Sequence, residues 1–430
     1  MKRIYLMKGQ LPYFLLTMSL SLNCLTEDDF KLKAKSICRQ LLPSSSWKRA
    51  SADQIRCSRI KTGKSNRLYI CELMSYDGVN NRQQIEYHDD GLLSPVTTTT
   101  TSISNQSSLI TELKKSQVQN KVIVRFYGSE FTGEGNQYRS ISDELECRIL
   151  DHLSSIGRAP KVYATFEGGR IDEFLENATL ATVDTLRSTP YLRSLAMQIA
   201  QFHALQIELP EGDYYEIIKY FGTQCIPKVD EHLNSDLSPG ERELITEIRN
   251  FVNSDQLNFI FGKMDNIDQR KVCGHFDLNP TNILVLPSET PQGRPTMDTL
   301  LIDFENCQTS FRGLDLGKFF SELSFTENNY IAARANGTSS SSQISPVSDA
   351  KIREFIRYYL TEWSSISDDF DPSIDNENNL FKEIKFNLML ALLGIIYWNV
   401  SNPDFLSKKL FNVTASRIIL YQQFAKRWFS

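Results

Sequence analysis

The sequence predicts an α+β protein in two lobes, a small antiparallel-sheet lobe over residues 27–175 and a larger, mainly helical lobe over residues 176–430. In the first half, short runs of alternating or β-branched residues recur between polar turns, which is typical of strands. Through most of the second half, apolar residues repeat at intervals of three and four, which is typical of helices. Two apolar runs in the second half, residues 283–286 and 300–304, predict a β-hairpin inside the helical lobe.

Length, composition and charge narrow the class of protein. Of the 430 residues, 41% are hydrophobic and 23% charged, which is typical of globular proteins. A chain of this length can hold two or three domains. The formal net charge of -5 provides no general attraction to nucleic acid or anionic lipid. Eight cysteines and five histidines without C-x-x-C pairs predict no zinc site. We expect reduced thiols, with Cys71 and Cys273 as small core residues.

The first lobe is predicted to contain two helices and five strands. Residues 27–42 form an amphipathic pattern with Phe30, Ala34, Ile37 and Leu41 on one face. A second helix is expected over residues 140–153, starting at the capping signal Ser140-x-x-Asp143. The predicted strands are residues 55–60, 67–73, 121–128, 161–166 and 169–175. Residues 76–119 are polar and of low complexity, so they are predicted to be a disordered insertion.

The second lobe is predicted to be mainly helical. Pro190 in the first turn and an apolar stripe predict a helix over residues 189–203 that ends in His203, a hydrogen-bonded core histidine. Further helices are predicted over residues 352–363, over the almost entirely apolar residues 386–398, and over residues 417–428. A second, Ser-rich insertion is predicted at residues 336–348. Arg312, Asp315 and Glu322 stand among apolar residues, so pairing or burial is expected.

The strongest functional signal is His275-x-Asp277-x-x-x-x-Asn282, which lies in the loop just before the first hairpin strand. Phosphoryl transfer requires a carboxylate that accepts the proton of the attacking hydroxyl, and Asp277 fits this role. Asn282 has an amide oxygen suited to Mg²⁺, and Asp303, at the end of the second hairpin strand, has a carboxylate suited to the same ion. His275 is expected to brace the loop. The His275–Asn282 motif alone also occurs by chance in unrelated loops. A chance match is less frequent when a second carboxylate, here Asp303, follows at the end of an apolar strand.

Candidate nucleotide-binding residues lie in the first lobe. The turn 61–66 contains Gly63-Lys64-Ser65, but it lacks the earlier glycine of a Walker A loop. Ser65 and Asn66 are therefore expected to hold phosphate through a hairpin turn, with an ordinary hairpin as the alternative. The region around Glu173 is expected to connect the lobes and to bind adenine through backbone groups.

Arg125 interrupts an apolar strand, and a buried cation requires a partner. We expect phosphate together with Glu144 or Glu146 of the following helix to fill this role. The alternative is that Arg125 points to solvent from an edge strand.

The chain resembles the choline/ethanolamine kinase family over residues 27–430, outside the two insertions. The resemblance rests on residues 124–128, 159–166, 274–283, 302–305 and 312–317. It implies a two-lobed protein-kinase-like fold and transfer of phosphate from ATP to the hydroxyl of a small amino alcohol. It further implies that Asp277 is the base, that Asn282 and Asp303 bind magnesium, and that Asp315 supports the catalytic loop.

The resemblance favours ethanolamine over choline as the acceptor. Choline recognition needs aromatic faces, yet Leu323 follows Glu322 where choline kinases have tryptophan. Asn306 follows Glu305 where the family has tyrosine, and residues 393–396 replace a tryptophan-rich stretch. A carboxylate such as Glu322 or Glu305 suits a primary ammonium better than bare rings do. A choline kinase, a kinase of another small hydroxyl compound and a non-enzymatic binding protein of this fold stay open.

Cofactors, partners and location follow from the same resemblance. ATP and Mg²⁺ are the expected cofactors, a small amino alcohol the expected partner, and a homodimer is possible in this family. Residues 1–26 have a basic start and a short apolar core like a signal peptide, but the core is shorter than the about 20 residues that span a bilayer. Because a secreted kinase lacks its nucleotide, we expect a dispensable extension or a weak membrane contact without stable insertion, and a cytoplasmic enzyme.

Overall fold

The protein was analysed as a computed structural model that describes residues 26–60, 66–74, 119–128, 140–263, 267–289, 295–326 and 344–429. The chain divides into two compact units, one formed by residues 1–135 and 162–174 and the other by residues 136–161 and 175–430. Residues 136–161 thus group with the second unit, whereas the sequence predicted one boundary near residue 175. Residues 1–25, Ser65, nearly all of the first insertion and residues 336–343 of the second lie outside the described residues.

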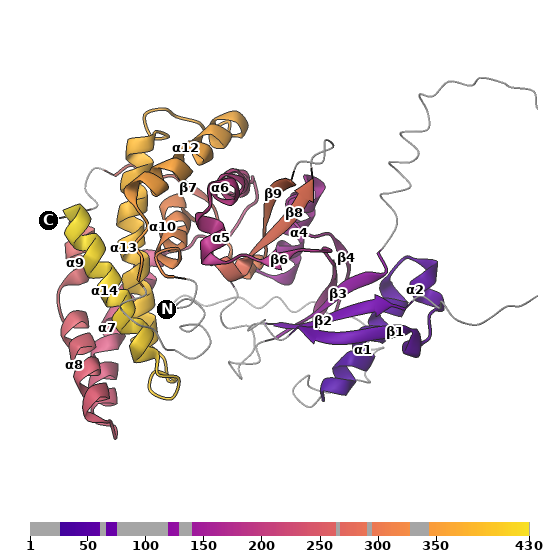
Figure 1. The fold of residues 1–430 in the computed structure, drawn as a ribbon, viewed down its shortest axis with the longest axis horizontal. Coiled ribbons are helices and arrows are strands. Elements are labelled where there is room, and N and C mark those ends of the chain that lie inside the picture. The colour runs from indigo at the N-terminus through magenta and orange to yellow at the C-terminus, as the bar shows by residue number, and fades with distance from the viewer. Residues whose placement is uncertain are drawn as a thin grey trace, which may run out of the picture. The chain divides into compact units, whose positions relative to one another are not determined.

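Figure 1 shows the elements of both units. Unit 1 contains α1 (Glu27–Leu41), α2 (Ser45–Arg49), β1 (Ile55–Ile60), β2 (Asn66–Leu73), β3 (Lys121–Tyr127), β4 (Val162–Phe166) and β5 (Gly169–Glu173). The strands of unit 2 are β6 (Thr179–Leu180), β7 (Lys271–Gly274), β8 (Ile283–Glu289), β9 (Pro295–Leu301) and β10 (Gln308–Phe311). The helices of unit 2 are α4 (Asp143–Ser155), α5 (Val183–Arg187), α6 (Thr189–His203), α7 (Tyr214–Leu233), α8 (Pro239–Val252), α9 (Gln256–Phe261), α10 (Arg312–Glu322), α12 (Asp349–Ile366), α13 (Glu377–Ser401) and α14 (Leu410–Phe429).

The sheet of unit 1 is antiparallel throughout, in the order β1-β2-β3-β5-β4. All five predicted strands are confirmed. Helix α1 starts at a capping box made by Thr26 and Asp29 and buries Phe30 and Ala34. Leu41, which was predicted to be in the buried stripe, is 39% exposed because the helix ends there. The core of the unit is a layer of aliphatic and aromatic side chains between α1 and the sheet.

The predicted central helix of unit 2 is confirmed. Helix α13 is buried on nearly all sides and lies among α7, α10, α12 and α14 in Figure 1. Gly313 and Gly317, one turn apart on α10, face it closely. A Cβ atom on Gly317 would lie 2.5 Å from the backbone of Asn387 and Leu388. The small residues therefore allow close packing of the two helices, which fixes the position of α10.

The predicted hairpin is also confirmed. Strands β8 and β9 pair antiparallel, with Ile283 opposite Leu301, and β6 extends them to a three-stranded sheet. Strand β9 ends at Leu301 rather than at the predicted residue 304, because Asp303 has a φ of 70° and starts a short 3₁₀ turn. A separate two-stranded sheet pairs β7 with β10 and holds the segment just before the predicted catalytic motif.

The predicted cap of the second helix is wrong by two residues. Helix α4 begins at Asp143, and its N-cap is Ser142, whose hydroxyl accepts a hydrogen bond from the N–H of Leu145. The hydroxyl of Ser140 instead accepts a hydrogen bond at 2.6 Å from Nε2 of Gln308. The Ser140 hydroxyl is thus engaged by Gln308, and Ser142 caps the helix.

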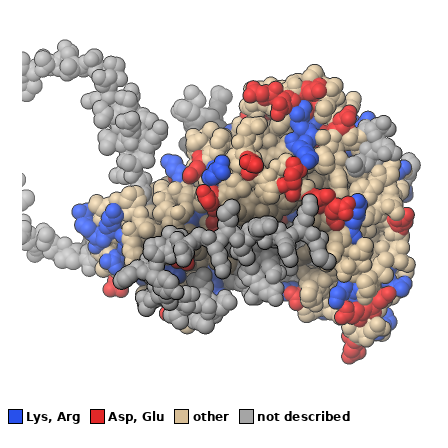
Figure 2. Space-filling view, turned by 180° about the vertical axis from the view of Figure 1, so that it is seen from behind, with Lys and Arg blue, Asp and Glu red and all other residues tan. Residues whose placement is uncertain are grey.

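The described surface carries charges of both signs. Figure 2 shows Lys and Arg side chains interspersed with Asp and Glu side chains on the face that it presents. In the part of the chain that the structure describes, none of the helices combines the length and apolar character needed to cross a membrane.

Candidate active site

The predicted catalytic motif, residues 275–282, lies in a loop whose backbone is held by a buried carboxylate. Phe276 has a φ of 65°, a conformation that bulky residues rarely adopt. Asp315 of α10 accepts hydrogen bonds from the N–H groups of His275, at 2.6 Å, and of Phe276, at 2.7 Å. A strained backbone persists where its surroundings determine it fully. Asp315 is therefore the support of the loop.

Asp315 is in turn held by a buried histidine. Nε2 of His203 lies 3.2 Å from Oδ2 of Asp315, and Nδ1 lies 3.0 Å from the hydroxyl of Tyr359. Burial lowers the pKa of His203, and the charge of Asp315 offsets this only in part. Burial raises the pKa of Asp315, but hydrogen bonds from His203 and from the loop backbone have the larger, opposite effect. The pKa of Asp315 is therefore lowered. The prediction that His203 is a hydrogen-bonded core residue is confirmed.

A His203→Gln variant is expected to lose less stability on acidification than the wild type. The pKa of His203 is lower in the folded than in the unfolded protein, where it is about 6.5. Below that pH the unfolded state binds a proton that the folded state does not. The contribution of neutral His203 to the free energy of unfolding is therefore complete above pH 6.5. It is lost as the pH falls toward the pKa of His203 in the folded protein, by up to about 1.4 kcal/mol per pH unit.

Urea unfolding at pH 7.5, 6.0 and 5.0 measures this difference. His152→Gln, at an exposed position of α4, is the matched control and should keep the wild-type slope. Equal slopes for His203→Gln and wild type would show that His203 takes up no proton on unfolding.

His275 braces the loop, as predicted for it. Its Nδ1 accepts a hydrogen bond at 3.3 Å from the N–H of Asp277, so the ring proton is on Nε2. That nitrogen lies 3.0 Å from the carbonyl oxygen of Ile302, just before Asp303. The ring thus links the loop to the chain that leaves the hairpin.

The carboxylate of Asp277 is held by an amide and an ammonium group. Oδ2 accepts a hydrogen bond at 2.9 Å from Nδ2 of Asn282, and Oδ1 lies 2.5 Å from Nζ of Lys318. Burial lowers the pKa of Lys318, but the charge of Asp277 more than compensates, so its pKa is raised. The Asp277 side chain is 34% exposed. It is thus a partly accessible carboxylate in a fixed orientation, as a proton acceptor requires.

The predicted magnesium ligands fit a hard cation. Nδ2 of Asn282 donates to Oδ2 and to the backbone oxygen of Asp277, which leaves the amide oxygen without a partner among the described residues. Ile302 donates to the carbonyl oxygen of Asn282 at 3.0 Å, so Asp303 lies one residue from this contact. Amide and carboxylate oxygens suit Mg²⁺, which takes few protein ligands and completes its shell with phosphate and water. Within the described ranges, no three His, Cys, Asp or Glu side chains gather around a metal position.

Arg125 lies on an inner strand and has a partner within its own unit. Its side chain is 12% exposed, and Nε lies 3.5 Å from Oδ2 of Asp172 on the neighbouring β5. Arg170 donates to the same carboxylate at 2.8 Å. The alternative that Arg125 points to solvent from an edge strand is therefore wrong, and the partner found in unit 1 is Asp172.

The other predicted nucleotide-binding residues are distributed over several elements. Asn66 starts β2 and is buried, whereas Ser65 before it lies outside the described residues. Glu173 ends β5, and Glu144 stands in the first turn of α4.

The four residues predicted to bind the acceptor differ in burial. Asn306 is half-buried, and the carboxylate of Glu305 is buried in the turn after Asp303. Glu322 ends α10 and pairs with Nη2 of Arg417 at 3.0 Å. Leu323 packs its side chain in the core, while its carbonyl oxygen accepts a hydrogen bond from Arg187.

Two cations near the site were not predicted. Lys318 stands three residues after Asp315 on α10, where this spacing places both on one face. Arg417 is a basic residue in the apolar first half of α14. In both cases, the sequence feature that could have predicted the cation is a charged residue within an apolar helical stripe.

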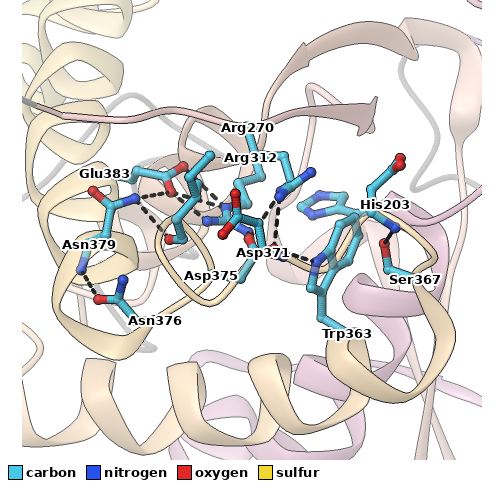
Figure 3. Close-up of polar contacts among 12 residues, drawn as sticks. His203, Arg270, Arg312, Trp363, Ser367, Asp371, Asp375, Asn376, Asn379 and Glu383 are labelled. Atoms are coloured by element: carbon cyan, nitrogen blue, oxygen red, sulfur yellow. Dashed lines mark hydrogen bonds and ion pairs between the residues drawn. The ribbon is translucent and has the colours of Figure 1, made fainter.

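A buried ion network anchors the start of α10. Figure 3 shows Arg312 between Asp375 and Glu383. The distances are 2.5 Å from Nη1 to Oδ1 of Asp375 and 2.6 Å from Nη2 to Oε1 of Glu383, and all three side chains are fully buried. Asp375 also pairs with Arg270 at 2.9 Å and accepts a hydrogen bond from Nε1 of Trp363. The pairing or burial predicted for Arg312 is confirmed.

Several known proteins are similar to this chain. The family model described as choline/ethanolamine kinase matches residues 96–411. A human protein named choline/ethanolamine kinase is 22% identical over 338 residues, which cover 78% of this chain and 70% of that protein.

Two solved structures have a similar fold. Choline kinase from Cryptosporidium parvum Iowa II superimposes with a TM-score of 0.57 at 17% identity, covering 92% of this chain and 95% of the other. Ethanolamine kinase from Plasmodium vivax gives a TM-score of 0.55 at 16% identity, covering 94% and 93%. These likenesses confirm the two-lobed, protein-kinase-like α+β fold.

Proposed function

The chain belongs to the choline/ethanolamine kinase family, and from this premise we propose that it phosphorylates the hydroxyl of ethanolamine with Mg-ATP. Members of the family are small-molecule kinases that act on an alcohol group. The observation that carries the proposal is the position of Asp277, whose carboxylate is oriented by Asn282 and Lys318 on a loop that Asp315 holds.

The proposed reaction uses Asp277 as the base. The carboxylate accepts the proton as the acceptor oxygen forms a bond to the γ-phosphorus, and the bond from that phosphorus to the bridging oxygen of ADP breaks. The ammonium of Lys318, 2.5 Å from Asp277, offsets negative charge that develops beside the acceptor oxygen. Asn282 and Asp303 are the proposed ligands of Mg²⁺, which neutralises phosphate charge when it is bound. Asn66 and Arg125, together with Ser65, are the proposed phosphate contacts.

Ethanolamine is preferred in this proposal because a quaternary ammonium finds little aromatic surface. Leu323 is buried and offers no ring, and Asn306 is polar. The ring of Phe325 has the guanidinium of Arg417 at 5.1 Å from its centroid, so an internal cation occupies one aromatic face. Glu305 is the proposed carboxylate near the ammonium of the acceptor. A homodimer and a cytoplasmic location are proposed on the family resemblance.

Purified protein with Mg-ATP is expected to release ADP when ethanolamine is supplied, with a kcat/KM about tenfold or more above that for choline. Coupled ADP detection measures both rates, and EDTA should abolish them because the transferred phosphoryl group requires Mg²⁺. Thermal stabilisation by Mg-ATP without turnover of either acceptor would instead favour a non-enzymatic binding protein. A choline rate equal to the ethanolamine rate would refute the preference alone.

A further inference from the structure

One ammonium group from outside the motif lies against the proposed base. Nζ of Lys318 is 2.5 Å from Oδ1 of Asp277 and 3.2 Å from the carbonyl oxygen of Phe276. Lys318 stands on α10, three residues after Asp315, whose carboxylate holds the backbone of the loop. Close packing of Gly317 against α13 fixes this helix. One rigid element therefore positions both the cation and the loop, as preorganised catalytic groups require.

The ammonium of Lys318 has one N–H more than its protein partners use. A lysine ammonium has three N–H donors, and Oδ1 of Asp277 and the carbonyl oxygen of Phe276 accept two of them. Among the described residues, no third acceptor lies within hydrogen-bond distance of Nζ. The side chain of Lys318 is 23% exposed and that of Asp277 is 34% exposed. The third donor is therefore available to a molecule that reaches Asp277.

The charge of Lys318 is maintained by its surroundings. Burial lowers its pKa, but the charge of Asp277, the hydrogen bond to it and the charge of Glu322 have the larger, opposite effect, so the pKa of Lys318 is raised. Nδ2 of Asn282 already orients the carboxylate of Asp277 through Oδ2, at 2.9 Å. A second, charged donor on the other oxygen therefore points to a role beyond holding this side chain.

The reacting groups come within reach of this ammonium. The acceptor hydroxyl has to lie about 2.6–3.2 Å from Asp277 for proton transfer, and its oxygen about 3–3.5 Å from the phosphorus that it attacks. The γ-phosphoryl group is therefore two contacts away from the Asp277 carboxylate, and Nζ of Lys318 lies directly beside this carboxylate. Phosphoryl transfer spreads negative charge over the equatorial oxygens of the transferred group. A fixed ammonium stabilises charge of this kind.

We propose that Lys318 is a further catalytic residue, whose third N–H donates to an oxygen of the γ-phosphoryl group during transfer. This inference rests on the proposed kinase function and adds a residue to the same site. The acceptor hydroxyl loses its proton to Asp277, its oxygen bonds to the γ-phosphorus, and the bond from this phosphorus to ADP breaks, while Lys318 keeps its protons. Because the contact is with the phosphoryl group, it is compatible with an acceptor that carries an ammonium at its other end, as ethanolamine does.

Single-turnover rates of the full chain with ethanolamine and Mg²⁺, measured with ATP and with ATPγS, test this contact. Sulfur is a weak hydrogen-bond acceptor, so a donor to the transferred group slows the reaction with ATPγS relative to ATP. Lys318→Met and Lys318→Gln both remove the ammonium, and each should lower the rate with ATP by about 10²- to 10³-fold, as for one preorganised donor. The ratio of the ATP rate to the ATPγS rate should fall by about tenfold, because the charge-assisted hydrogen bond that sulfur weakens is no longer made.

Two further variants and a binding measurement serve as controls. Lys318→Arg keeps a cation at this position, so its rate ratio should lie closer to that of the wild type than to that of Lys318→Met. Lys228→Met removes a lysine that pairs with Glu231 at 2.8 Å on α7 and is 48% exposed, and it should keep both wild-type rates. Calorimetric titration should give a Kd for Mg-ATP close to that of the wild type for every variant, which also verifies that each is folded.

The outcomes separate this inference from the proposed function. If the two neutral variants lowered both rates by the same factor, Lys318 would only position Asp277, and the phosphoryl contact would be refuted while the kinase function stands. Unchanged rates in these variants would refute the contact as well. If Lys318→Arg had the same rate ratio as the neutral variants, the cation would not be its cause. If the wild type phosphorylated neither ethanolamine nor choline although Mg-ATP binds, the proposed function itself would fall, and this inference with it.

Discussion

Replacement of Asp277 by asparagine is expected to lower kcat by about 10²- to 10⁴-fold, the range that a general base contributes. Asparagine has the shape of aspartate but accepts no proton. Asn282 and His275, which orient the side chain and its backbone, are unchanged in this variant. The loop conformation is also preserved, because Asp315 holds it through the backbone of His275 and Phe276. The loss should therefore appear in kcat, with Mg-ATP affinity close to that of the wild type.

Steady-state kinetics with calorimetric titration of Mg-ATP distinguish these effects. Asp298→Asn is the matched control. Asp298 is a carboxylate of β9 that pairs with Arg158 at 3.1 Å and lies outside the catalytic loop. This control should keep most of the wild-type kcat. If Asp277→Asn retained more than about a tenth of it, Asp277 would not be the base.

Local patterns predicted the strands of unit 1, the hairpin, several helices and part of the site, but not α7, α8, α9 or the pairing of β7 with β10. The hairpin followed from two apolar runs, and the motif from His275 to Asn282 lies in the loop before it. These features depend on residues that are close in the sequence, where periodicity and turn chemistry are informative. The strain at Phe276 and the left-handed backbone of Asp303 have no such signal, because tertiary contacts impose them.

Pairings between distant residues were not predictable in the same way. Lys318 pairs with Asp277 across 41 positions, and Arg417 pairs with Glu322 across 95 positions. Burial among apolar neighbours indicates that a charge needs a partner, but it does not identify which one. For Arg125, Asp172 of the adjacent strand is a partner that the sequence did not indicate. Partner choice depends on how helices and strands pack, and a single sequence does not specify this.

Replacement of Arg312 by methionine is expected to lower the free energy of unfolding by about 3–5 kcal/mol, because it removes one member of a buried ion network. Asp375 would keep Arg270, at 2.9 Å, whereas Glu383 would lose its cation. Burial already raises the pKa of Glu383 to about 7, against the opposing effect of Arg312. Without Arg312 the ionised form of Glu383 would be disfavoured further, so the loss should be greater at pH 8 than at pH 6.

A double variant separates charge from packing. Arg312→Met with Glu383→Met removes both members of one pair, and buried pairs replaced by apolar side chains often cost little. The double variant should therefore recover a large part of the stability lost by Arg312→Met.

Arg357→Met, which removes a surface pair to Glu377 with 58% of the arginine side chain exposed, should cost no more than about 1 kcal/mol. Chemical unfolding of the four proteins measures these differences. If the double variant were less stable than Arg312→Met, the lost stability would come from the shape of the buried network rather than from an uncompensated charge.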